Sequence, residues 1–289
     1  MTIHTTLSAA EVEAFAPEAK VGLLATVNDD GLPHVTMISS LRARSSTELT
    51  WGQFTEGESK RHVRANPRVG WLVMTLDRRL WRGRADWTHT RSEGEEFELY
   101  NHQPMFRYNA YFGIHTVHYM KLVDHRGQEG LSIPRIAVGS ILALASRPLW
   151  RTGRPERILK PWAEGLLGKL DTLKFLAWVG DDGYPVIVPM APAVAADSRR
   201  VLWVPSVHRE QLLSLREGTP VALYVATMQM ESVLMRGRFC GYRRKPGWRV
   251  GSLDLDYVYN SMPPKFGQIY PQVPLTPAFR PRPRAVASA

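Results

Sequence analysis

The chain has 289 residues, of which 44% are hydrophobic, and this length allows two domains of ordinary size. No apolar run approaches the roughly 18 residues that a membrane span needs, and the N-terminus lacks the pattern of a signal peptide. We therefore expect a cytoplasmic protein that does not insert into a membrane. Cys240 is the only cysteine, which excludes an internal disulfide and gives no support for a zinc site or thiol catalysis.

The net charge of +10 favours anionic partners, among them nucleic acid and phosphorylated small molecules. The arginines, however, are spread along the chain. They form no basic helix, and no strand motif spaces aromatic residues for base stacking. Nucleic-acid binding is therefore not the expected function.

The first half of the chain predicts a mainly β structure. Ser8-Ala-Ala-Glu11 is a capping box, which begins a helix that extends to about residue 19. A turn at Asn28-Asp-Asp-Gly31 separates the first two strands. A short helix that ends at Asn66-Pro67 and a helix over residues 92–101 interrupt the later strands. The expected strands cover residues 21–27, 35–41, 49–54, 69–76, 80–87 and 111–123. This order predicts an antiparallel β-barrel with flanking helices.

The corner after the third strand has the composition of an anion site. Ser59 is the predicted N-cap of the short helix, and Lys60 and Arg61 follow it directly. A helix start leaves backbone N–H groups unpaired and carries partial positive charge, so an anion is stabilised there. The alternative interpretation is an ordinary capped surface helix with two solvated cations.

The second half repeats the first at a shift of 152 residues. From Leu24 to Thr75, 15 of the 52 aligned positions are identical, whereas unrelated sequences would match at about three. With two inserted residues, Leu80-Trp-Arg-Gly-Arg84 matches Leu234-Met-Arg-Gly-Arg238, and Tyr100-Asn101 matches Tyr259-Asn260. The sequence therefore predicts an internal duplication.

The second copy differs from the first at the anion corner. Gln211, Leu212 and Leu213 stand where the first copy has Ser59, Lys60 and Arg61, and Val188 and Ala191 replace Thr36 and Ser39. We expect that the second copy has lost the anion site. It also shows no evident equivalent of the strand predicted at 111–123.

The comparison of the two copies divides the chain into four segments. They are residues 1–125 with the intact phosphate site, a connector at 126–156, a degenerate second copy at 157–270, and a Pro- and Arg-rich tail at 271–289 that we expect to be partly disordered. Within the connector, residues 136–146 are apolar enough for a buried strand or short helix.

The order of these motifs resembles the FMN-binding split-barrel superfamily, the pyridoxamine 5′-phosphate oxidase-like proteins, with two copies in tandem. The resemblance is carried by Asp-Asp-Gly31-Leu-Pro33, by the segment from Trp51 to Lys60, by Ala65-Asn-Pro-Arg-Val69 and by Leu80-Trp-Arg-Gly-Arg-Ala85. It implies that two barrels associate and that FMN lies in the cleft between them. A flavin needs an apolar slot for its ring and a cationic end for its phosphate.

The resemblance also implies the cofactor-binding residues. Ser59 and Lys60, with Arg61 in support, would hold the phosphate. The ring would be lined from the second strand by Thr36, Met37, Ile38 and Ser39, and from the third by Gly52, Gln53 and Phe54. No catalytic side chain and no metal ligand is assigned. In the oxidase proper an arginine and a lysine stand just before the corner helix and an arginine-rich substrate motif lies near the C-terminus. Here the cations begin one position later and that motif is missing, so pyridoxamine phosphate oxidation is not supported.

The resulting hypothesis is an FMN-dependent oxidoreductase that transfers hydride on a small molecule. NAD(P)H is a candidate electron donor. The two copies would pair within one chain as a pseudo-dimer, the second closing the cleft of the first. Further homodimerisation stays open.

Three alternatives stay open as well. The cofactor could be the deazaflavin F420, or the protein could be a flavin-binding module without catalysis. Haem is the third alternative, because of His115-Thr-Val-His118, although residues three apart on a strand point to opposite faces. Trp51 and Trp203 occupy matched positions in the two copies and are expected in the cores rather than against a ring.

Overall fold

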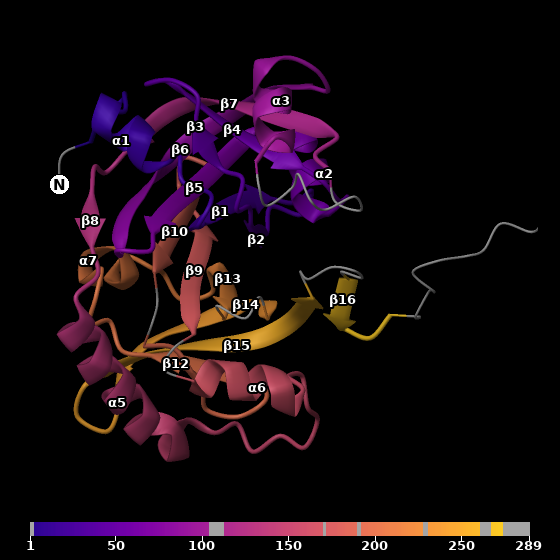
Figure 1. The fold of residues 1–289 in the computed structure, drawn as a ribbon. Helices are drawn as coiled ribbons and strands as arrows, with labels where there is room; N and C mark the ends of the chain where they lie inside the picture. The colour runs from indigo at the N-terminus through magenta and orange to yellow at the C-terminus, as the bar shows by residue number, and fades with distance from the viewer. Residues whose placement is uncertain are drawn as a thin grey trace, which may run out of the picture.

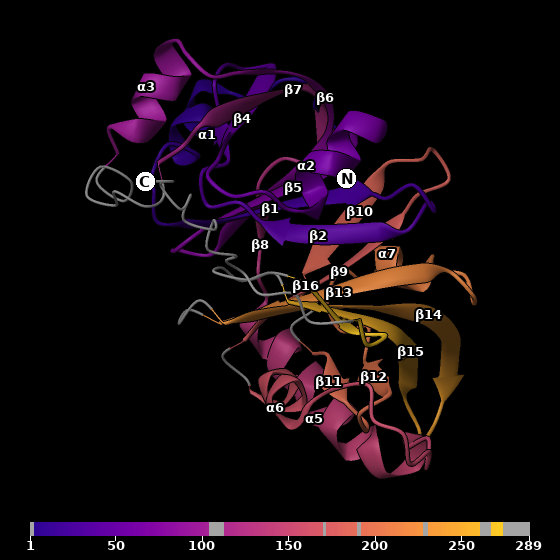
Figure 2. The same cartoon turned by 90° about the vertical axis from the view of Figure 1, so that its right-hand side faces the viewer.

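The computed structural model describes residues 3–103, 113–169, 172–189, 192–227, 231–260 and 267–273. The described chain forms two antiparallel sheets, one from each half, which lie one above the other (Figure 1). Helices α1 and α3 lie on the outer side of the first sheet, and α5 and α6 on the outer side of the second (Figure 2). The mainly β fold and the tandem arrangement predicted from the sequence are confirmed.

The first half contains each strand that the sequence predicts. Its elements are α1 (Ala9–Ala14), β1 (Lys20–Val27), β2 (Pro33–Met37), β3 (Arg42–Ala43), β4 (Glu48–Gln53), α2 (Glu58–Ala65), β5 (Arg68–Thr75), β6 (Arg79–Arg91), α3 (Glu95–Asn101), β7 (Thr116–His125) and β8 (Glu129–Gly130). The capping box at Ser8 is present, but α1 ends at Ala14, ahead of Pro17. The strand expected from residue 111 begins at Thr116, and residues 104–112 lie outside the described part.

The second half repeats this plan. Its elements are α5 (Ile133–Trp150), α6 (Pro161–Gly168), β9 (Leu173–Val179), β10 (Pro185–Pro189), β11 (Val194–Ala195), β12 (Arg200–Trp203), α7 (Arg209–Leu213), β13 (Pro220–Ala226), β14 (Ser232–Arg244), β15 (Arg249–Asn260) and β16 (Gly267–Tyr270). The strand order β2-β1-β5-β6-β7-β4-β3 of the first sheet recurs as β10-β9-β13-β14-β15-β12-β11 in the second. Most of the expected tail, residues 274–289, lies outside the described part.

The structure corrects the expectation that the second half lacks one strand. β15 takes the place of β7, between β14 and β12. The match between Tyr100-Asn101 and Tyr259-Asn260 is also wrong, because the first pair lies in α3 and the second ends β15. β14 runs through a short turn directly into β15, without a helix like α3, so an alignment through this region fails.

A second correction concerns the inserted residues. Leu72 on β5 pairs with Arg82 on β6, and Tyr224, which lies 152 residues after Leu72, pairs with Leu234 on β14. The shift of 152 therefore holds in both strands, and no residues are inserted. In the structure Leu234 corresponds to Arg82, and Arg236 corresponds to Arg84, so the motif matched by sequence is two positions out of structural register.

The connector contains a long helix in place of the buried strand or short helix expected there. α5 spans 18 residues and packs Ala143 and Trp150 against the outer side of the second sheet. Its other side leaves Val138 and Ile141 exposed. No helix in the described residues combines the length and the apolar character that crossing a membrane requires.

Each sheet has its own core, and a third apolar cluster joins the two halves. Trp51 and Trp203 are buried in the first and second core. The shared cluster is made by the facing strands of both sheets. It contains Val21, Leu23, Ala25, Val35, Leu72, Met74, Leu80, Phe175, Ala177, Ile187, Ala222, Tyr224, Ala226, Leu234 and Tyr259.

Gly70 on β5 sets how closely the halves approach. A Cβ placed on Gly70 would lie 2.2 Å from the carbonyl oxygen of Pro185 on β10. Backbone fills the space that a side chain would need, so the strands could accept an alanine only by moving apart.

We expect Gly70→Ala to destabilise the protein by about 1–3 kcal/mol, because the added methyl group overpacks the contact between the sheets. Urea unfolding followed by tryptophan fluorescence measures this. The matched control is Gly165→Ala in α6, where an added Cβ meets nothing within 4 Å and helix propensity favours alanine. An unchanged unfolding midpoint for Gly70→Ala would contradict the packing described here.

Candidate functional site

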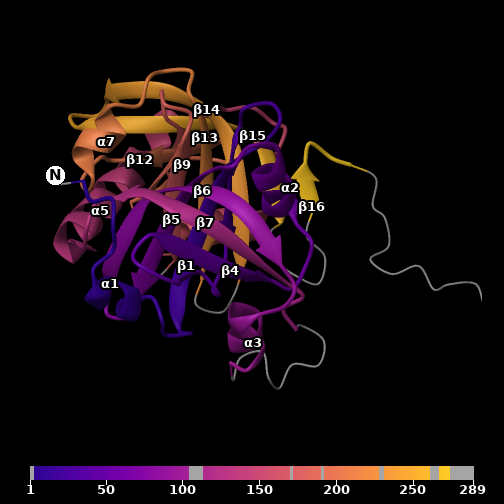
Figure 3. The ribbon, with the colours of Figure 1, turned by 90° about the horizontal axis from the view of Figure 1, so that it is seen from above.

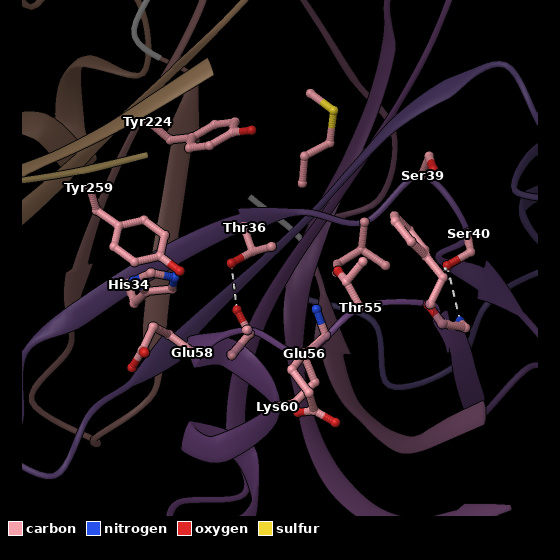
Figure 4. A pocket seen from close by; sticks show the side chains of 16 residues that line it. His34, Thr36, Ser39, Ser40, Thr55, Glu56, Glu58, Lys60, Tyr224 and Tyr259 are labelled. Carbon is pink, nitrogen blue, oxygen red and sulfur yellow. Dashed lines mark hydrogen bonds between the residues drawn. The ribbon is translucent and has the colours of Figure 1, made fainter. Parts of the chain in front are cut away.

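A pocket lies where the first half meets the second (Figure 4). β2, the loop from β4 to α2 and the first turn of α2 form most of its wall, and two tyrosines of the second half complete it. Figure 3 shows α2 on the same side of the molecule as β15. The empty space, counting the open mouth, is about 920 Å³. The lining residues are His34, Thr36, Met37, Ile38, Ser39, Ser40, Gly52, Phe54, Thr55, Glu56, Gly57, Glu58, Ser59, Lys60, Tyr224 and Tyr259.

Most of the residues assigned from the sequence meet in this pocket. Those that line it are Thr36, Met37, Ile38, Ser39, Gly52, Phe54, Ser59 and Lys60. Gln53 and Arg61 do not. The Gln53 side chain is buried, where its amide donates to the Glu56 carboxylate at 2.9 Å, and Arg61 is exposed and paired with Glu58.

Two local features fix the end of β2 against the rest of the wall. A Cβ on Gly22 would lie 2.2 Å from the carbonyl oxygen of Ile38, and the Ile38 N–H donates to the Gly22 carbonyl at 2.7 Å. This close contact turns the chain after β2. The Ser40 hydroxyl then donates to the carbonyl of Gly52 and accepts from its N–H, which ties the turn to β4 (Figure 4).

The N-cap of α2 is Gly57, not Ser59 as predicted. Ser59 lies in the first helical turn, where its buried hydroxyl shares a hydrogen bond of 2.5 Å with the Thr36 hydroxyl on β2. No side chain caps this helix terminus. The helix start therefore faces the pocket with two hydroxyls and without a capping side chain to satisfy its first N–H groups.

Lys60 places a buried positive charge at the same point. Its side chain is 7% exposed, and its ammonium lies 5.9 Å from the centroid of the Trp51 ring and points to the pocket (Figure 4). In the described residues it makes no ion pair and no hydrogen bond. Burial lowers the pKa of Lys60 to about 8, with the nearby Glu56 acting in the opposite direction. At neutral pH the group is mostly charged and lacks a direct counter-ion.

Two carboxylates also line the pocket, and each has a partner. Glu56 accepts from the Gln53 amide. Glu58 is paired with Arg61 and lies 3.5 Å from His62 Nε2. The unpaired ammonium is therefore the charge on the described wall that an incoming anion can neutralise.

Sequence reasoning missed three aromatic residues of the site. Tyr224 and Tyr259 come from the second half, so no local pattern in the first half indicates them. His34 lies on β2, and its ring meets Tyr259 and His62 edge to face at centroid distances of 5.3 and 5.2 Å. Burial holds the pKa of His34 well below its usual value, so the His34 ring is neutral at neutral pH.

His118 is a core residue with both ring nitrogens bonded. Nδ1 accepts from the Trp87 indole at 3.1 Å, so Nε2 donates to the Gln53 side-chain oxygen at 2.7 Å. Burial lowers its pKa to about 3. His115 is exposed, and no three His, Cys, Asp or Glu side chains gather as metal ligands within the described ranges.

The matching corner of the second half is filled from within. Arg82, whose structural equivalent in the second half is Leu234, donates to the Gln211 side-chain oxygen at 2.6 Å and to the Ile187 carbonyl at 2.7 Å. It also forms a two-point ion pair with Glu129 at 2.9 Å for each bond. The corner of the second half that corresponds to the first pocket is therefore occupied by the salt bridge between Arg82 and Glu129.

Comparison with known proteins supports this description. Residues 8–120 match the family model for pyridoxamine 5′-phosphate oxidase. A search of curated proteins gives no match.

Three similar solved structures each cover less than half of this chain. An FMN-binding protein from Syntrophomonas wolfei subsp. wolfei is 14% identical over 38% of this chain and 78% of its own, with a TM-score of 0.33. An F420 reductase is 18% identical over 42% of this chain and 98% of its own, with a TM-score of 0.34. A FAD-binding protein from Mesorhizobium loti is 20% identical over 45% of this chain and 98% of its own, with a TM-score of 0.29.

The family match runs from α1 into β7 and includes β2, the loop from β4 to α2 and the start of α2, which form most of the pocket wall. The second half has the same strand order. The chain therefore matches the pyridoxamine 5′-phosphate oxidase family over residues 8–120, and its second half is a tandem copy of the same fold.

Proposed function

We propose that this protein is an FMN-dependent oxidoreductase that binds one flavin per chain and transfers hydride on a small molecule. One observation carries the proposal: the buried ammonium of Lys60 has no ion-pair or hydrogen-bond partner among the described residues, and it lines the same pocket as the hydroxyls of Ser59 and Thr36. A buried charge without a partner is costly, and such sites in proteins usually serve a ligand. The phosphate of FMN has the charge and the acceptor oxygens that this corner lacks.

The rest of the pocket suits the flavin ring. Met37, Ile38 and Phe54 offer apolar surface from the first half, and Tyr224 offers an aromatic face from the second. When bound, FMN supplies the hydride chemistry. The role of the chain is to hold the phosphate, place the ring against the wall and exclude water from it.

The haem alternative loses support, because both nitrogens of His118 are engaged in the core. F420 also carries a phosphate, so the corner suits it too. The visible spectrum and the mass of the cofactor extracted from purified protein separate FMN from F420.

The first test compares FMN with riboflavin, which lacks the phosphate. We expect one equivalent of FMN to bind per chain, and Lys60→Met to weaken FMN binding by about 10- to 100-fold, since a charge-assisted contact contributes about 1.5–3 kcal/mol. Riboflavin affinity should change less than about twofold. Fluorescence titration measures both.

Arg64→Met is the matched control, because Arg64 lies on the exposed side of the same helix. It should leave the affinity for FMN unchanged. Two equivalents of FMN per chain, or equal loss of FMN and riboflavin binding in Lys60→Met, would contradict the assigned phosphate site.

The pH dependence of FMN binding reports the charge of Lys60. Because burial lowers its pKa to about 8, the ammonium is present below that pH and is lost above it. We expect the preference for FMN over riboflavin to be constant near pH 7 and to fall by up to about tenfold per pH unit above 8. A preference that stays constant to pH 10 would show that Lys60 does not contact the phosphate.

Catalysis is tested by reduction. When FMN-loaded protein is mixed with NADH or NADPH without oxygen, we expect the visible absorbance of the flavin to disappear and to return in air. The comparison is free FMN at the same concentration. Reduction no faster than that of free FMN by either nucleotide would favour the flavin-binding module without catalysis.

A further inference from the structure

A second cation, Arg236, does not line the pocket but is close enough to its His34–Tyr259 end to lower the pKa of His34. Arg236 lies on β14, where it pairs with Tyr257 of β15 in the sheet. Its guanidinium carbon lies 4.2 Å from the centroid of the Tyr257 ring. The Tyr257 ring is nearly parallel to that of Tyr259, which lines the pocket, with 6.3 Å between the centroids.

Structural register relates Arg236 to Arg84 of the first half. Arg84 is held by two carboxylates, Asp124 of the neighbouring strand and Asp182 of the opposite half. In the second half Tyr257 takes the position of Asp124. Arg236 makes neither an ion pair nor a hydrogen bond among the described residues. It therefore lacks, within that part of the chain, the counter-ions that its equivalent Arg84 has.

Other charged groups near Arg236 do not replace the missing carboxylates. Asp256 lies close enough for Arg236 and Arg238 to act on its pKa, but it forms no ion pair with either. Glu58 is engaged by Arg61. His34 and His62 also face this region, and the charge of Arg236 helps to lower the pKa of each, after burial as the largest cause.

A guanidinium that lies over an aromatic ring can still bind a planar anion. Stacking on a ring uses the face of the guanidinium and leaves its N–H groups directed outward in one plane. A carboxylate matches two of these N–H groups at once, as Glu129 matches Arg82 in this same fold. Less of the binding energy is then lost in ordering the side chain.

We propose that Arg236 binds the carboxylate of a small organic acid, which enters the pocket at the His34–Tyr259 end and lies next to the cofactor. That the acid is a substrate rests on the proposed function. The binding of its carboxylate by Arg236 does not. It makes the second half a part of substrate recognition, with the first half holding the phosphate.

The test uses benzoate and its neutral analogue benzamide as probes, titrated by calorimetry at constant ionic strength into the full chain with and without FMN. We expect benzoate to bind at least about tenfold more tightly than benzamide, and Arg236→Gln to abolish that difference. The control is Arg238→Gln, since Arg238 is exposed on the same strand and contacts only the Gly218 carbonyl among the described residues. The affinity for FMN should be the same in both variants and the wild type.

The outcomes separate this proposal from the previous one. Equal binding of benzoate and benzamide, no binding of benzoate, or a preference that survives in Arg236→Gln would overturn the carboxylate site. Loss of FMN binding in Arg236→Gln would assign the arginine to the cofactor phosphate instead and would also overturn it. A benzoate preference that depends on Arg236 in a protein that binds no FMN would retain the site and refute the flavin function.

Discussion

The apolar contact between the two sheets is the interaction on which the candidate site depends. The residues of the first half form an open wall, and Tyr224 and Tyr259 of the second half complete it. The same strands that carry these tyrosines contribute to the cluster that joins the halves. Gly70 lets the backbones approach closely enough for this contact. Neither half lines the whole pocket by itself, so the site is complete only when the two halves are paired.

Joining two copies in one chain removes a constraint that a symmetric dimer imposes. In a two-fold dimer every substitution appears in both sites. Here the two positions have diverged: Arg82 fills the second one, where the first has Leu234, and Gln211 replaces Ser59. The ion pair with Arg82, together with His208, lowers the pKa of Glu129 to about 2 despite burial, which acts in the opposite direction. At the second corner Arg82 is paired with Glu129 of its own sheet, and its hydrogen bonds to Ile187 and Gln211 link it to the second half.

Much of this architecture is encoded locally and was predictable. The capping box at Ser8, the turn at Gly31 and the alternation of apolar residues define most elements of the first half, and the repeat defines the second. β15 was missed because the alignment matched its last residues, Tyr259-Asn260, to Tyr100-Asn101 of α3. Leu253 and Leu255 nevertheless alternate with Asp254 and Asp256 as in a strand with one buried face.

The errors at the site have equally specific causes. Gln53 shares a strand face with Trp51, and a side chain two residues from a core tryptophan also points to the core, so its orientation could have been inferred. Gly52 and Phe54 lie on the opposite face, toward the pocket. Arg61 follows Ser59 and Lys60 in sequence, yet a helix turns it to the exposed side. The tyrosines of the second half and Arg236 belong to contacts between distant segments, which no local pattern contains.

The charge at Lys60 links stability to binding. Folding lowers the pKa of this lysine from 10.5 to about 8, so at neutral pH the folded protein carries a charged group that it disfavours by roughly 3 kcal/mol. Burial of the charged Lys60 therefore destabilises the folded state. This destabilisation is fully present below pH 8 and disappears as the pH rises toward 10.5. An anion that binds beside the ammonium restores the favourable environment that water provided in the unfolded chain, and its binding stabilises the folded state by mass action. Under the proposed function, the phosphate of FMN is the anion that would satisfy this charge.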